Sequence, residues 1–253
     1  MKEDFNFDRC VTLKEGTYFS IMLAISIIFY LICIVSIVGF LYILLIALSL
    51  FFAQAVAIAT IKQNSIKVSH EQFGDVYQKV VEYSNTLDLG YIPEVYLMQS
   101  NGLLNAFVTR FLFKDIVVIY SDIFELAYEQ GETAVNFIVA HELAHVKRKH
   151  LSLDKYILFG KLIPFLGLAY SRACEQTCDR IAYKLVGELG YEGLILLAAG
   201  KKLYKKVNVE LFLSNASLER NFWSWFSEIC STHPHLSSRV RNLKDINERF
   251  RLD

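Results

Sequence analysis

The sequence lacks charged residues over a long stretch close to its N-terminus. No Asp, Glu, Lys or Arg occurs from Gly16 through Ile61. A single membrane-spanning helix needs about 20 apolar residues, so this stretch is too long for one span. It also lacks the basic start and the limited length of a secretory signal. We expect a hairpin of two spans, at about 17–37 and 41–61, with a tight turn at Val38-Gly39-Phe40.

Two alternatives stay open for this stretch, a single long tilted helix and a buried hairpin inside a soluble protein. A two-span hairpin returns the chain to the side of the membrane on which it began. Basic residues flank the stretch at Lys14, Lys62 and Lys67, and none lies in the expected turn. Because cytoplasmic flanks are enriched in Lys and Arg, we expect both ends of the hairpin in the cytoplasm.

The net charge, the low proline content and the cysteine count each exclude some kinds of protein. The formal net charge is zero, which argues against nucleic acid as a partner. Only three prolines occur, with no internal repeat or low-complexity tract, so no linker is evident. The five cysteines are odd in number, and Cys33 lies in the apolar stretch, which excludes a disulfide framework and fits a reducing compartment.

Beyond the apolar stretch, short strand-like segments precede a run of helical ones. We expect strands at 94–99, 106–108 and 115–120, and helices at 69–89, 123–128, 132–150, 172–186, 191–202 and 237–250. The apolar segment 151–170 is interrupted by charges and Pro164, and we interpret it as a cleft wall or an interfacial segment. The aromatic cluster at 221–226 belongs either to the core or to a membrane- or cleft-facing surface. The pattern predicts an α+β fold, mainly helical with a small sheet, with the membrane hairpin at 1–67 and a second domain at 68–253.

The expected helix at 132–150 contains the pattern His141-Glu142-Leu143-Ala144-His145. Residues four apart on a helix share one face, so both imidazoles can bind the same Zn²⁺. Glu142 lies beside that line and can contact a zinc-bound water, which is the equipment for metal-assisted peptide hydrolysis. Surface histidines are the alternative, but the preceding apolar run 134–140 predicts a buried helix, and buried polar groups need partners.

A catalytic zinc site needs a third protein ligand and one open position. His150 is one position short of the third histidine in the H-E-x-x-H-x-x-G-x-x-H pattern. Glu175, on the expected helix at 172–186, is the better candidate. Asp179 follows one turn later and can fix the orientation of a ligating histidine. A structural site with two histidines and the thiolates of Cys174 and Cys178 stays open as a rival.

Four segments in register resemble the HtpX-like membrane zinc metallopeptidases, a family that also includes the CAAX prenyl endopeptidases. The segment 171–179 resembles the family's S-R-x-x-E-x-x-x-D element, and Asn105-Ala106-Phe107 its N-A-F strand. The segment 115–124 resembles the strand and turn before the metal helix, and Thr232-His233-Pro234 with Arg239 the late H-P-x-x-x-x-R element. The chain departs from the family at Cys178, where a small residue is usual, and in 151–170, which is too short for a second membrane pair.

This resemblance implies a zincin-type (gluzincin) domain with one Zn²⁺ held by His141, His145 and Glu175. Glu142 would be the general base and acid, and His233 would donate to the oxyanion with support from Arg239. Asn105 and Ala106 would lie on an edge strand that pairs with an extended substrate. Plainer alternatives stay open: turn chemistry for Asn105 and His233, and a surface charge for Arg239.

The expected function is therefore a zinc-dependent endopeptidase anchored in the plasma membrane by its hairpin. Its substrates would be proteins or peptides, with quality control of membrane proteins as the leading role. Processing of a lipidated or short peptide is one alternative. A non-catalytic membrane scaffold with a structural zinc is another, although the intact Glu142 argues against it.

Overall fold

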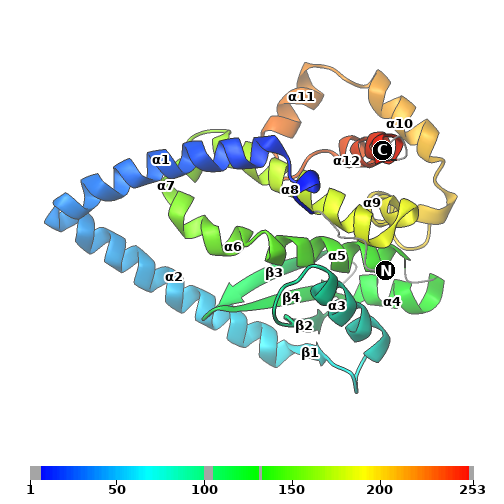
Figure 1. The fold of residues 1–253 in the computed structure, drawn as a ribbon, viewed down its shortest axis with the longest axis horizontal. Helices are drawn as coiled ribbons and strands as arrows, with labels where there is room; N and C mark the ends of the chain where they lie inside the picture. The colour runs from blue at the N-terminus through cyan, green and yellow to red at the C-terminus, as the bar shows by residue number, and fades with distance from the viewer. Residues whose placement is uncertain (1–6, 100–104, 131–132, 251–253) are drawn as a thin grey trace.

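The computed structural model describes residues 7–99, 105–130 and 133–250 (Figure 1). The N-terminal half contains η1 (Phe7–Cys10), α1 (Leu13–Val35), α2 (Ile37–Asn64), β1 (Ser65–Val68), α3 (Gly74–Thr86), β2 (Glu94–Met98), β3 (Ala106–Phe111), β4 (Lys114–Tyr120) and α4 (Ser121–Gln130). The C-terminal half contains α5 (Thr133–Lys147), α6 (His150–Leu153), η2 (Asp154–Ile157), α7 (Leu158–Lys161), α8 (Leu166–Val186), η3 (Glu188–Tyr191), α9 (Glu192–Ala199), η4 (Tyr204–Lys206), α10 (Val209–Leu218), α11 (Phe222–Ile229) and α12 (Leu236–Phe250). The fold is mostly helical with one small sheet, which confirms the expected class.

The uncharged stretch forms two helices, α1 and α2, that meet at Ser36 and diverge as a V (Figure 1). The expected turn at 38–40 lies instead at Ser36, because the Ser36 hydroxyl accepts a hydrogen bond from the backbone N–H of Gly39 at 3.2 Å and caps α2. Gly39 then packs so closely that an added Cβ would lie 2.7 Å from the carbonyl oxygen of Cys33. The single long helix is thereby excluded.

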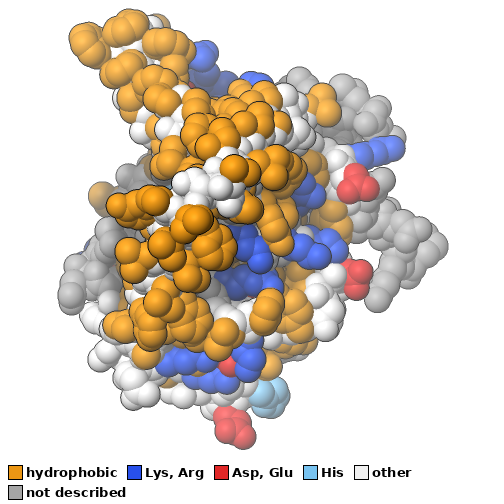
Figure 2. All heavy atoms as spheres, turned by 90° about the vertical axis from the view of Figure 1, so that its left-hand side faces the viewer, with side chains coloured by type: hydrophobic (Ala, Val, Ile, Leu, Met, Phe, Trp, Pro, Cys, Tyr) orange, Lys and Arg blue, Asp and Glu red, His pale blue; other side chains and the backbone are white. Residues whose placement is uncertain are grey.

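Both helices of the V are long and apolar enough to cross a membrane. Their most apolar windows have mean hydropathy 2.6 and 2.4 and are only 11% and 6% buried. The core helix of a soluble protein would be mostly buried, so the soluble hairpin does not fit. Figure 2, which looks toward the tip of the V, shows hydrophobic side chains over much of this face, with basic side chains gathered between them.

The two arms of the V hold different parts of the chain. α1 packs against α7 and α8, and Gly160 of α7 comes so close that an added Cβ would lie 2.4 Å from the Met22 Cβ. α2 covers one face of the sheet, where Ile58 packs with Tyr96, Ile116 and Val118. The segment 150–161 runs between the arms, and the expected boundary at 67/68 falls inside β1, which follows α2 directly (Figure 1).

The sheet has four strands in the order β1-β2-β4-β3, with β2 and β4 parallel and the other pairs antiparallel. Side chains alternate between its faces, as the pleat requires. Val117 and Ile119 face the main core, while Ile116 and Val118 face α2. Within the described residues β3 pairs with β4 alone, so its other edge is free beside α5.

The helix α5 lies between the sheet and α8 at the centre of the domain. Eleven of its 15 residues are buried, which is the pattern of a helix that packs on all sides. Within it, His141 is 7% exposed and Glu142 is 8% exposed, so the surface-histidine alternative is excluded. The helix ends at Lys147 rather than at 150, because Lys149 takes a left-handed conformation with φ 56°.

The sequence patterns missed several elements that depend on distant partners. β1 was not expected, and α8 begins at Leu166 rather than at 172. The aromatic cluster at 221–226 forms α11, which starts with a capping box between Asn221 and Ser224. Trp223 is 71% exposed and Trp225 57% exposed, so this cluster belongs to the surface and not to the core.

Candidate metal centre

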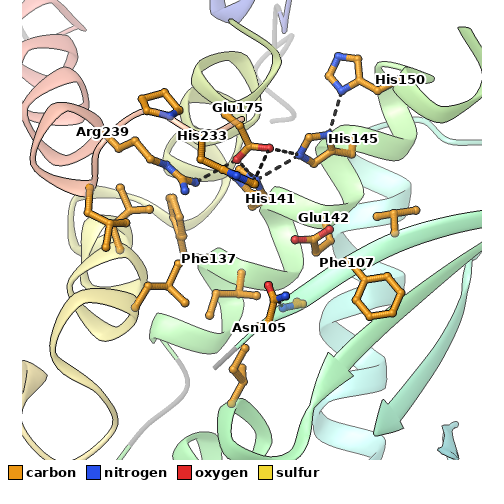
Figure 3. Close-up of a pocket in the computed structure, with 18 of the residues that line it drawn as sticks. Asn105, Phe107, Phe137, His141, Glu142, His145, His150, Glu175, His233 and Arg239 are labelled. Atoms are coloured by element: carbon orange, nitrogen blue, oxygen red, sulfur yellow. Dashed lines mark hydrogen bonds and ion pairs between the residues drawn. The ribbon is translucent and has the colours of Figure 1, made fainter. Parts of the chain in front are cut away.

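Three side chains from α5 and α8 converge on one point at the centre of Figure 3. His141 and His145 lie one turn apart on α5, and their Nε2 atoms are 3.2 Å apart. Glu175 reaches them from α8, with Oε2 3.3 Å from His141 Nε2 and Oε1 3.2 Å from His145 Nε2. The structure therefore brings together the three residues that were expected to bind the metal.

The outer nitrogen of each histidine faces a polar partner of its own. Nδ1 of His141 lies 3.0 Å from Oδ1 of Asp179, although its N–H does not point straight at that oxygen. Nδ1 of His145 lies 2.9 Å from Nδ1 of His150. When each Nδ1 carries the proton, each Nε2 keeps a lone pair. Both lone pairs then point toward the carboxylate of Glu175.

Three acceptors that meet in a buried place favour a bound cation or a proton between them. Ligands bound tetrahedrally to zinc at about 2.0–2.1 Å lie roughly 3.3 Å from one another. The three separations of 3.2, 3.3 and 3.2 Å match that value. The donor set of two imidazoles and one carboxylate thus fits Zn²⁺.

In the metal-free protein a proton takes the place of the cation. Burial opposes the charged form of His141, but the Glu175 and Asp179 carboxylates raise its pKa to about 10. Burial alone would raise the pKa of Glu175, but His141 and His145 hold it well below the usual range. The site therefore keeps a negative carboxylate ready beside two nitrogens.

Arg239 lies beside Glu175 (Figure 3) and binds Asp179. Its Nε and Nη2 donate to the two carboxylate oxygens of Asp179 at 2.7 and 2.6 Å, and Nη2 lies 3.4 Å from Glu175. It is 6% exposed, so it is not a surface charge. We expected it to support the oxyanion donor, but the structure places it on Asp179, where it lowers the pKa of that carboxyl against the opposing effect of burial.

Glu142 and His233 lie on the open side of the centre (Figure 3). Burial raises the pKa of Glu142, which suits a group that must take up and release a proton near neutral pH. The His233 side chain is 59% exposed, and its Nε2 lies 3.5 Å from Glu175 Oε1. Arg172 holds the preceding loop by donating to the carbonyl oxygens of Ile229 and Ser231 at 2.8 and 2.7 Å. Arg172 belongs to the S-R element of the sequence, but its partner could not be read there.

A cavity of about 480 Å³ opens in front of these residues. Asn105 and Ala106 line it, at the start of the free edge of β3. Asn105 accepts the backbone N–H of Tyr120 at 3.1 Å, and its side chain accepts the N–H of Ala106 at 3.0 Å. The other walls are mainly apolar and include Phe107, Phe137, Ile138, Leu151, Leu194 and Leu197. The arrangement can hold an extended peptide beside Glu142.

The sequence did not identify Glu15 and His150 as neighbours of the metal centre. His150 was considered only as a metal ligand, yet its Nε2 lies 3.2 Å from Oε1 of Glu15 on α1. Arg148 donates to the same oxygen from Nη2 at 2.8 Å. Burial lowers the pKa of His150. The available signal was Glu15 itself, the last charged residue before the long uncharged stretch.

The two cysteines of α8 are not among the residues that line the cavity. Cys178 groups with His145 and His150, and Cys174 groups with Glu15 and His150; in the described residues neither joins a group with His141. Burial raises the pKa of both thiols, which disfavours the thiolate forms that bind zinc. The arrangement does not support the two-histidine, two-cysteine site.

The fold and this centre define a class, the zincin-type metallopeptidases with apolar N-terminal helices. The sequence profile of peptidase family M48 matches residues 70–157 and 151–247, and the chain belongs to this family. The crystal structure of S. mikatae Ste24p is similar, with a TM-score of 0.51 and 12% identity over 88% of this chain. The chain spans 62% of the Ste24p chain, and at this identity the likeness speaks for the fold alone. No curated protein matches the sequence.

Proposed function

We propose that this membrane metallopeptidase is a zinc-dependent endopeptidase that binds one Zn²⁺ through His141, His145 and Glu175. The observation that carries the proposal is the convergence of three acceptors at 3.2–3.3 Å beside a cavity. Bound there, Zn²⁺ would polarise the scissile carbonyl and make water a stronger nucleophile near neutral pH. Asp179 orients His141, and Arg239 holds Asp179 in place.

The side chains on the cavity side divide the proton transfers of peptide hydrolysis between them. Glu142 takes a proton from the attacking water and later gives it to the departing amine. His233 donates its Nε2–H to the oxygen that becomes negative, and such a donor contributes about 10²–10³ in rate. The free edge of β3 at Asn105 and Ala106 pairs with the substrate backbone.

We further propose that the substrates are unfolded or misfolded segments of membrane proteins. A strand edge recognises peptide backbone rather than one side-chain sequence, and the cavity walls accept apolar side chains. Processing of a lipidated or short peptide is the rival, which the same apolar walls allow. Comparing cleavage of an unfolded casein-type substrate with cleavage of a prenylated peptide separates the two.

The proposed setting is the plasma membrane, with α1 and α2 as two spans and the catalytic domain in the cytoplasm. Lys62 and Lys67 flank the second span, and no basic residue lies near the tip at Ser36. Reporter fusions after Lys67 and at the C-terminus should both report the cytoplasm. A periplasmic or external signal from either fusion contradicts this orientation.

The central experiment measures zinc content and hydrolysis of detergent-purified wild type and Glu175→Ala. Wild type should hold about one zinc and cleave the substrate, while the variant should lose both, because two histidines alone bind weakly. Equal zinc in both proteins would exclude Glu175 as a ligand. Zinc without hydrolysis in wild type would favour the non-catalytic scaffold.

A further inference from the structure

We propose that Glu15, in the first turn of the apolar helix α1, is a positioning residue for the metal ligand His145 and acts through His150. The inference rests on the zinc site proposed above. It gives the helix α1 a part in the metal centre. A helix that served only as a membrane anchor would need only apolar contacts.

Three side chains from separate segments form an unbroken chain of contacts. Oε1 of Glu15 lies 3.2 Å from Nε2 of His150, and Nδ1 of His150 lies 2.9 Å from Nδ1 of His145. Figure 3 shows the second contact, with His150 on the side of His145 that faces away from Glu175. Glu15 is 4% exposed and His150 7% exposed, so both side chains are largely shielded from bulk water.

The protons of this chain can be arranged in only one way when a metal is bound. A ligating His145 uses the lone pair of Nε2 and carries its proton on Nδ1, which donates to His150. His150 must then accept at Nδ1 and carry its proton on Nε2, where Glu15 accepts it. The carboxylate thus fixes both tautomers, as single carboxylates do for metal-bound histidines elsewhere.

The local sequence brings His150 into this place by a tight turn. Lys149 has φ 56°, a left-handed conformation that is usual for glycine after a helix. The turn ends α5, and His150, the first residue of α6, lies beside His145 rather than one and a half turns further along. A continued helix would carry His150 away from the ligand.

Glu15, at the other end of this series of contacts, is held in place by the start of α1. The backbone N–H of Thr12 donates to Thr177 Oγ1 at 3.1 Å, and the Thr12 hydroxyl donates to the carbonyl oxygen of Ala173 at 3.3 Å. These partners flank Glu175 on α8. The first turn of α1 is therefore fastened to the ligand helix, and Glu15 comes with it.

Zinc affinity of the full-length protein in detergent, measured by competition with a chromophoric chelator, tests the proposal. His150→Leu should bind zinc about 10–100-fold more weakly, as is usual for the loss of an outer hydrogen bond. His150→Asn places an acceptor near the position of Nδ1 and should recover part of that loss. Glu15→Gln should weaken binding by a smaller factor than His150→Leu, because the amide oxygen still accepts.

Arg148→Gln is the matched control. It removes the other partner of the same Glu15 oxygen but leaves the contact between His150 and His145. It should lower the melting temperature of the metal-free protein and leave zinc affinity close to that of wild type. A role for Glu15 as a mere tether of α1 predicts the opposite, with Arg148→Gln weakening zinc as much as His150→Leu.

Three results would overturn the proposal. The first is a zinc affinity of His150→Leu that lies within twofold of wild type. If that variant does not fold, unchanged zinc affinity in both His150→Asn and Glu15→Gln would overturn the proposal instead. A second zinc in wild type that disappears in His150→Asn would instead make His150 and its neighbours a separate metal site. No zinc in wild type removes the proposed function itself, which distinguishes that failure from this one.

Discussion

The two sides of the metal centre differ in how firmly their side chains are held. On the cavity side, His233 is 59% exposed and its Nε2 lies 3.5 Å from the nearest carboxylate oxygen of Glu175. On the opposite side, Asp179 is 2% exposed and accepts two hydrogen bonds of 2.7 and 2.6 Å from Arg239. One side has groups with loose contacts, and the other has a closed network.

This difference matches the tasks that the two sides would perform. A group that transfers a proton or meets a changing charge must exchange partners during each turnover. A group that orients a metal ligand must keep one partner throughout. Changes on the cavity side should therefore reduce the rate and spare zinc, whereas changes on the opposite side should weaken zinc.

The largest effect is expected for Glu142→Gln. The amide cannot accept a proton from water, so turnover should fall by about 10²–10⁴. Gln has nearly the same shape, and Glu142 is not among the converging acceptors, so zinc content and melting temperature should stay near wild type. Hydrolysis of a fluorescent casein-type substrate, beside metal analysis, checks both. Turnover close to wild type would falsify the mechanism.

The next effect in size is expected for His233→Ala, also on the cavity side. Loss of one donor to the developing oxyanion should reduce kcat by about 10²–10³, with little change in KM or zinc content. His235→Ala is the control, because His235 instead contacts Ser227 at 3.0 Å. Matching kinetics for the two variants would make His233 only a turn residue.

On the opposite side, Asp179→Asn should separate the two behaviours. The amide can still meet His141 but no longer neutralises the buried Arg239, so zinc affinity should fall about 10–100-fold. Stability should fall too, because breaking one partner of a buried ion pair costs about 3–5 kcal/mol. Chelator competition and thermal unfolding measure the two losses. Full zinc affinity with reduced kcat would place Asp179 on the catalytic side instead.

Acid should act on the same network. The pKa of Asp179 is lowered in the folded protein because Arg239 and His141 outweigh burial. Its contribution to stability is therefore complete above the unfolded value of about 3.9 and is lost as pH falls through the folded pKa. In Asp179→Asn this acid-dependent part should be missing from the curve of unfolding free energy against pH.

The sequence predicted the parts of the site that lie close together on one helix. His141, Glu142 and His145 follow from helical spacing, and the four-residue interval from Glu175 to Asp179 placed both on one face of α8. The strand β4 followed from its β-branched residues. In each case the signal was local, and the periodicity of one element was enough.

The features that were missed depend on contacts across the fold. Glu15 and His150 are 135 positions apart, and no pattern in either segment announces the other. Arg239 could be matched to a motif, but only the packing of α12 on α8 shows that its partner is Asp179. β1 exists because β2 is there to pair with it. The left-handed turn at Lys149 has no glycine to signal it.

The smallest effect is expected for Cys174→Ala and Cys178→Ala. Both cysteines lie near the hydrogen-bond network of the metal ligands but are not needed for it. Cys178 is fully buried, and its Sγ is 3.9 Å from Nδ1 of His150. In the proposed arrangement that nitrogen accepts the proton of His145, and burial raises the pKa of the thiol. Removing either sulfur should leave zinc affinity and kcat within about twofold of wild type, with a modest loss of packing stability. A large drop in zinc affinity for Cys178→Ala alone would mean that the thiol is a ligand or holds His150 in place. The network that holds the metal ligands would then include the Cys178 thiol as well as the carboxylates and imidazoles.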